Sequence, residues 1–127
     1  MIEICNKTKF TLDIALIKKI TSFFLKKYKI KGKDVSIAII ARINFQYRKK
    51  DKSTDVLSFR GEDNFLGEIL IDAAQIKRQA KKNKNTFKDE FIFILVHGLL
   101  HLAGFDDKTE AQSKIMHKLG MDFIKKL

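Results

Sequence analysis

The sequence has very little of several residue types, and each scarcity excludes a class of protein. It has no proline, no tryptophan and a single cysteine, Cys5. An internal disulfide framework is therefore excluded, and we expect Cys5 to be a small buried hydrophobic residue in a protein of a reducing compartment. Its longest apolar run covers residues 91–102, only 12 positions interrupted by His and Gly, which is too short to cross a bilayer. No charged start followed by a long apolar stretch opens the chain. We expect a cytoplasmic protein without a membrane partner.

The length predicts a single domain over residues 1–127, because 127 residues leave no room for a second independent core. Apolar residues make up 45% of the chain, which is enough to bury a core at this size without covalent staples.

The charge is strongly positive, with 26 basic against 15 acidic residues and a formal net charge of +11. Such a surplus favours polyanionic partners, although a merely lysine-rich exterior explains it equally well. Of the basic residues only 4 are arginine. Where such a chain retains an arginine, its planar fork of donors is expected to match a phosphate or a carboxylate.

Hydrophobic periodicity predicts an α+β fold with a mixed four-stranded sheet, in which one strand is antiparallel, covered by about five helices. The strands are expected at residues 2–4, 35–41, 56–59 and 66–71, and the short connection at 60–64 makes the last two a hairpin. Helices are expected at 12–29 with Thr11 as N-cap, at 43–50 (a short helix or a turn), at 73–82, from Thr86 onward, and at 109–127.

The helix that opens at Thr86 is the candidate for chemistry. Residues 91–104 are apolar all round, which is typical of a helix in the middle of a molecule. This helix carries His97 and His101 four positions apart, on one face, where both rings can reach one metal ion. Two core histidines with ordinary hydrogen bonds are the alternative, but the segment offers almost no polar side chains to satisfy them.

A third ligand follows the helix. Gly104 is placed to end it in a left-handed conformation, which brings Asp107 back toward the histidines. The spacing His-x3-His-x2-Gly-x2-Asp supplies three ligands for zinc and leaves the fourth position open for water, as in catalytic sites. Alternatives stay open: Asp107 with Glu110, or Thr109 with Gln112, can cap the last helix, and Asp106 or His117 can be the ligand instead.

Two segments carry a resemblance to a known family. The run from His97 to Asp107, HGLLHLAGFDD, resembles the zinc-binding signature of the YbeY family of rRNA-maturation endoribonucleases. The run 43–59, INFQYRKKDKSTDVLSF, is similar to the other hallmark of that family, and 66–71, LGEILI, to the strand that follows it. The order and spacing match over residues 40–107. The departures are Asp107, where the family has a third histidine, and Ser53 and Arg60, where it has prolines.

The resemblance implies a zinc-dependent single-strand endoribonuclease that hydrolyses RNA phosphodiesters in 16S rRNA maturation and ribosome quality control. It implies Zn²⁺ held by His97, His101 and Asp107 with water in the open position, Arg48 as the catalytic group at the scissile phosphate, and single-stranded rRNA and the small ribosomal subunit as partners. No DNA partner is expected. Thr54 and Asp55 also match motif positions, and Asp55 is expected to hold the loop or a ligand in place.

Two other functions compete with this one. An RNA-binding ribosome-assembly factor with a structural or weak metal site is the alternative. A zinc peptidase is disfavoured because Gly98 stands directly after the first histidine, where such enzymes carry a glutamate base. Gly98 also costs about 1 kcal/mol of helix propensity against alanine, which indicates close packing or access at that point.

Overall fold

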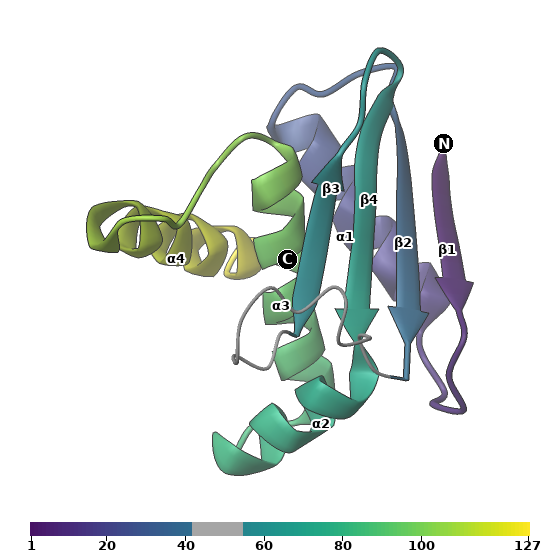
Figure 1. Cartoon of the computed structure of the whole chain (residues 1–127), viewed down its shortest axis with the longest axis vertical. Helices are drawn as coiled ribbons and strands as arrows, with labels where there is room; N and C mark the ends of the chain where they lie inside the picture. The colour runs from purple at the N-terminus through teal and green to yellow at the C-terminus, as the bar shows by residue number, and fades with distance from the viewer. Residues whose placement is uncertain (42–54) are drawn as a thin grey trace.

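The computed structural model describes residues 1–41 and 55–127, which form four strands and four helices (Figure 1). In chain order these are β1 (Ile2–Asn6), α1 (Ile14–Lys27), β2 (Asp34–Ile40), β3 (Val56–Arg60), β4 (Phe65–Asp72), α2 (Ala73–Lys82), α3 (Phe87–Leu102) and α4 (Glu110–Ile124). The expected fifth helix, at 43–50, lies outside the described residues.

The sheet is mixed, as the periodicity predicts. Its strand order is β1-β2-β4-β3, with β1, β2 and β4 parallel and β3 antiparallel to β4. The hairpin between β3 and β4 is confirmed, and its register pairs Ser58 with Ile69 and Arg60 with Gly67. This register directs Ser58 and Arg60 toward the same side of the sheet as Ile69, because alternate residues of a strand share a face.

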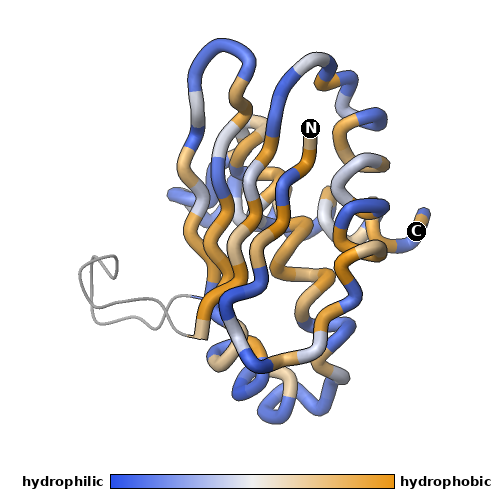
Figure 2. The backbone as a smooth tube through the Cα atoms, turned by 90° about the vertical axis from the view of Figure 1, so that its right-hand side faces the viewer, coloured by the Kyte–Doolittle hydropathy of each residue, from blue (hydrophilic) through white to orange (hydrophobic). Residues whose placement is uncertain are grey.

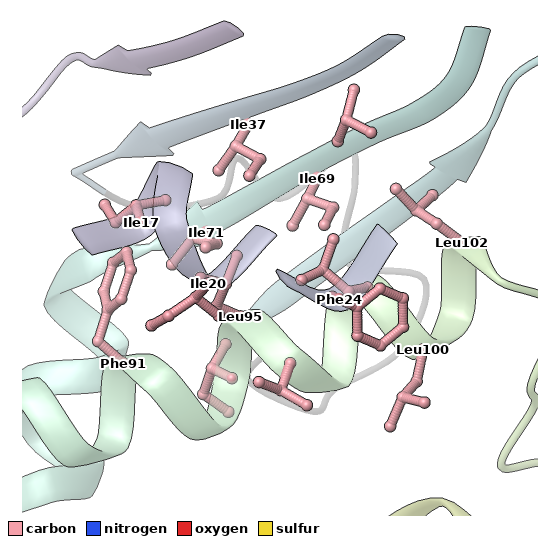
Figure 3. Packing of buried hydrophobic residues seen from close by; sticks show 14 of the residues in the cluster. Ile17, Ile20, Phe24, Ile37, Ile69, Ile71, Phe91, Leu95, Leu100 and Leu102 are labelled. Atoms are coloured by element: carbon pink, nitrogen blue, oxygen red, sulfur yellow. The ribbon is translucent and has the colours of Figure 1, made fainter. Parts of the chain in front are cut away.

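Helices α1 and α3 lie against one face of the sheet (Figure 1). The hydropathy colouring in Figure 2 shows hydrophobic residues along the strands and along the helical segments that lie next to the sheet. The core between these layers is a single cluster in which Ile37, Ile69 and Ile71 from the sheet meet Phe24 of α1 and Leu95 of α3, all 0% exposed (Figure 3). The prediction of an α+β fold in which the helix that carries His97 and His101 is central is confirmed, since α3 contacts α1, α2, α4 and the two strands β3 and β4.

The prediction that Thr11 caps the first helix is wrong. The helix begins at Ile14, and the N-cap is Asp13, whose carboxylate accepts a hydrogen bond from the Leu16 amide at 3.0 Å. A carboxylate at the N-cap accepts from a free amide of the first turn and interacts favourably with the positive end of the helix dipole. The helix therefore begins after Asp13 and not after Thr11.

The prediction that Cys5 is buried is also wrong, because the thiol is exposed. In the edge strand β1, alternation places Cys5 with Glu3 on one side, while Ile4 packs against the core cluster. Across residues 1–41 and 55–127, none of the helices has the combined length and apolarity that a bilayer span requires.

Candidate metal centre

Helix α3 carries the two histidines and is held tightly against the sheet. Its N-cap is Thr86, whose hydroxyl accepts from the Asp89 amide at 3.0 Å, as expected. A methyl group added at Gly98 would lie 3.1 Å from Ile69 Cγ2 and 3.2 Å from Val56 Cγ2, so only glycine lets the helix approach this closely. The Gly98 carbonyl also accepts a hydrogen bond from Ser58 Oγ at 3.1 Å. The predicted close packing at Gly98 is therefore confirmed.

The chain turns back directly after α3. The Gly104 amide donates to the His101 carbonyl at 3.1 Å and the Phe105 amide to the Leu100 carbonyl at 3.0 Å, which is the Schellman arrangement. Gly104 has φ +108°, in the left-handed region that favours glycine, as predicted. The ring of Phe105 then packs edge-on against Tyr28, the C-cap of α1, with centroids 6.0 Å apart. This turn directs the next residues back along the helix.

The turn brings three possible metal ligands together: His97, His101 and Asp107. The two Nε2 atoms lie 3.2 Å apart, and Oδ2 of Asp107 lies 3.4 Å from Nε2 of His97 and 3.7 Å from Nε2 of His101. Ligands held at about 2.0–2.1 Å in a tetrahedron around zinc lie about 3.3–3.4 Å from one another. The spacing of the three atoms therefore fits one face of such a tetrahedron. Charge-assisted hydrogen bonds would be shorter, at about 2.7–2.9 Å.

The protonation of His97 suits a metal ligand. Burial lowers the pKa of His97 below its ordinary value, and the neighbouring His101 lowers it further, while Asp107 and Asp55 oppose the change. The imidazole is therefore neutral near pH 7 and has a nitrogen lone pair to donate, which metal binding requires.

The structure places the alternative roles elsewhere. The N-cap of α4 is Thr109, which forms a capping box with Gln112, so Asp107 is not needed as a cap. His117 is an exposed residue of α4 whose ring lies at a tilt of 58° to that of Phe93, with centroids 5.7 Å apart, and it does not belong to the ligand cluster.

Asp106 is paired with an arginine that sequence reasoning left without a role. Arg60 Nη2 lies 3.4 Å from Asp106 Oδ1, and Arg60 Nε donates to the His101 carbonyl at 3.1 Å. The scarcity of arginine could have indicated this role, because the few arginines of the chain are expected to pair with a phosphate or a carboxylate.

Of the remaining predicted residues, Arg48 and Thr54 lie outside the described residues. Asp55 directly precedes β3, and its Oδ2 accepts from Gln79 Nε2 at 3.0 Å while its carbonyl accepts from the Asp72 amide at 2.9 Å. These bonds tie the beginning of β3 to α2 and to the end of β4, and the expected role of Asp55 in holding the loop or a ligand stays a prediction.

Comparison with known proteins gives a consistent result. A family model described as Endoribonuclease YbeY matches residues 3–127. Endoribonuclease YbeY of Malacoplasma penetrans is 36% identical over 91% of this chain and 86% of that protein, and Endoribonuclease YbeY of the aster yellows witches'-broom phytoplasma is 34% identical over 98% of both. The solution structure of TM1509 from Thermotoga maritima superposes with a TM-score of 0.72 at 28% identity, covering 98% of this chain and 87% of the other.

Proposed function

The chain belongs to the YbeY endoribonuclease family, and we propose that it is a cytoplasmic zinc-dependent endoribonuclease that hydrolyses single-stranded regions of 16S rRNA during maturation and quality control of the small ribosomal subunit. The observation that carries the proposal is the tetrahedral spacing of Nε2 of His97, Nε2 of His101 and Oδ2 of Asp107. The net charge of +11 is compatible with a polyanionic substrate.

The three ligands that would hold the ion come from two segments of the chain. His97 and His101 come from a rigid helix, and Asp107 comes from the turn beyond its end. Zinc bound there supplies an acidified water and a Lewis acid toward a phosphodiester oxygen. Asp107 brings a negative charge where an imidazole would be neutral, so it lowers the positive charge of the site by one unit and weakens its attraction for phosphate.

Arg48 is the group proposed to bind the scissile phosphate. A guanidinium presents a planar fork of donors that matches phosphate oxygens and stabilises the charge that develops on them in the transition state. Asp55 is proposed as a positioning group for the strand next to His97, since its carboxylate is tied to Gln79.

Gly98 argues against peptide hydrolysis. The position directly after the first histidine has no side chain to serve as a base, and the tight contact with Ile69 and Val56 leaves no room for one. The remaining competitor is an RNA-binding assembly factor with a structural metal.

The test combines metal analysis with RNA cleavage. Protein purified without chelator should contain zinc, and it should cleave single-stranded RNA. Arg48→Ala should lose cleavage while it retains zinc, and His101→Ala should lose both. Arg78→Ala is the matched control, because this exposed arginine of α2 bonds only to Gln75 among the described residues. Cleavage that persists in His101→Ala would refute the proposal that a metal ion held by His101 is needed for cleavage. A wild-type protein that contains zinc and binds RNA but does not cleave it would favour the assembly factor.

Asp107→Asn tests the third ligand. Ligation by the carboxylate predicts a fall in zinc affinity of about tenfold or more, which corresponds to about 1.4 kcal/mol. Unaltered affinity would exclude Asp107 from the site.

A further inference from the structure

Two adjacent carboxylates follow the turn after α3, and only one of them faces the histidines. The side chains of Asp106 and Asp107 are exposed to a similar extent, 39% and 41%. Each offers the same ligand chemistry to a cation, and the segment that carries them has no regular secondary structure. Something in the fold must therefore decide which carboxylate joins the histidines.

Arg60 contacts both parts of the site. Its Nε donates to the carbonyl of His101, a histidine of the candidate metal centre, and its Nη2 lies 3.4 Å from Oδ1 of Asp106. The same His101 carbonyl accepts the Gly104 amide that closes the turn. One side chain thus joins the last turn of α3 to the segment that brings Asp107 back.

The backbone of Arg60 is itself firmly placed. It pairs with Gly67 in the antiparallel ladder of β3 and β4. A methyl group added at Gly67 would clash with the Phe59 carbonyl oxygen and lie 2.6 Å from Leu102 Cδ2, so glycine allows both the pairing with β3 and the contact of the end of α3 with the strand. Strand pairing and the contact of Leu102 with the strand therefore hold the backbone of Arg60 near the end of α3.

We propose that Arg60 is a positioning residue that selects the third metal ligand: it pairs with Asp106 and thereby leaves Asp107 as the carboxylate directed at His97 and His101. The inference rests on the proposed metal site. Arginine suits this role because its planar fork bonds a carbonyl and a carboxylate at once, whereas lysine is a single flexible point charge. Without Arg60, Asp106 is free to compete for the ion and the segment loses its tie to the helix.

The expected effect is moderate. The Arg60 side chain is 52% exposed, and exposed ion pairs are weak. Groups that orient metal ligands change metal affinity by about tenfold or more when they are removed. We expect Arg60→Ala to lower zinc affinity about three- to tenfold.

The experiment measures binding of Zn²⁺ and Co²⁺ to the metal-free full chain, by competition with a chelator and by the visible absorption of bound Co²⁺. Arg60→Ala should weaken zinc binding and change the Co²⁺ spectrum. Arg60→Lys should restore only part of the affinity. Arg78→Ala removes the same charge from α2 and should leave both readouts unchanged.

Asp106→Ala shows whether the arginine acts through its carboxylate partner. The double variant Arg60→Ala with Asp106→Ala should bind zinc about as weakly as Arg60→Ala alone, because without Arg60 the Asp106 carboxylate has no pairing left to lose. Additive losses would contradict this, since independent residues add their effects.

Two results separate the failure of this inference from the failure of the metal site. If Arg60→Ala binds Zn²⁺ and Co²⁺ as the wild type does, while Asp107→Asn is weakened, Arg60 selects nothing and the proposed site stands. If Asp107→Asn is also unaltered, the proposed site itself fails. Thermal unfolding of each metal-free variant checks that the fold is retained.

Discussion

Two buried glycines allow the packing of α3 to be tested with a single added methyl group. Gly98 and Gly120 both lie inside helices, so alanine at either position gains about 1 kcal/mol of helix propensity. They differ in the space that the new methyl group would find. At Gly120 the nearest atoms are Leu100 Cδ1 at 3.8 Å and Val96 Cγ1 at 3.9 Å, which is ordinary van der Waals contact.

At Gly98 the methyl group would meet three side-chain carbons at 3.1–3.3 Å, closer than the optimum of about 3.5–4.0 Å. These carbons belong to Ile69, which is 0% exposed, and to Val56 on the neighbouring strand, so neither can move aside freely. Overpacking of this kind costs about 1–3 kcal/mol. Helix propensity offsets about 1 kcal/mol of that, which leaves Gly98→Ala between neutral and about 2 kcal/mol less stable than the wild type.

The comparison of the two variants removes the propensity contribution, because it is the same in both. Gly120→Ala should be about 1–3 kcal/mol more stable than Gly98→Ala, and each kcal/mol corresponds to about 3–5 °C in Tm for a domain of this size. Urea and thermal unfolding in the presence of chelator measure this difference without any contribution from metal. Equal stabilisation by both alanines would refute the conclusion that α3 is held against the sheet at Gly98.

Three further predictions follow from the site and its surroundings. Burial lowers the pKa of His97 below its ordinary value of 6.5, so on acidification this histidine binds a proton in the unfolded chain before it does so in the folded one. The contribution of His97 to the stability of the metal-free protein should therefore be constant above about pH 6.5 and should fall below that pH. The midpoint of urea unfolding should depend less steeply on pH in His97→Gln than in the wild type. Thr109→Ala removes the capping box of α4 and should cost about 1 kcal/mol in urea unfolding, whereas Thr109→Ser should cost little; a loss of zinc affinity without a loss of stability would contradict a purely capping role. Zinc at about 100 times its Kd should stabilise the wild type by about 2.7 kcal/mol, and an equal rise in Tm for His101→Ala would show that the ion binds elsewhere.

Most of the architecture was readable from local patterns. Alternation and helical spacing depend on neighbours a few positions apart, so the four strands, the hairpin and the central apolar helix were predicted close to their observed bounds. The histidine pair and the turn at Gly104 were readable for the same reason, because four residues of helix and one left-handed residue determine their geometry.

The choices between equivalent residues depended on tertiary contacts. Sequence placed Asp106, Asp107 and Thr109 within four positions, each a suitable cap or ligand, and could not rank them. The folded chain assigns the cap to Thr109 and pairs Asp106 with an arginine 46 positions away. The exposure of Cys5 likewise depends on which side of the edge strand the helices cover.

The physical reason is the range over which each preference acts. Backbone propensity and hydrophobic periodicity are properties of a short segment. The local sequence therefore determines the strands, the helices and the position of the two histidines on one face of a helix. The direction of a carboxylate depends on charges and hydrogen-bond donors that reach it only when distant strands and helices pack. The fold therefore decides that Asp106 pairs with Arg60 while Asp107 lies near His97 and His101.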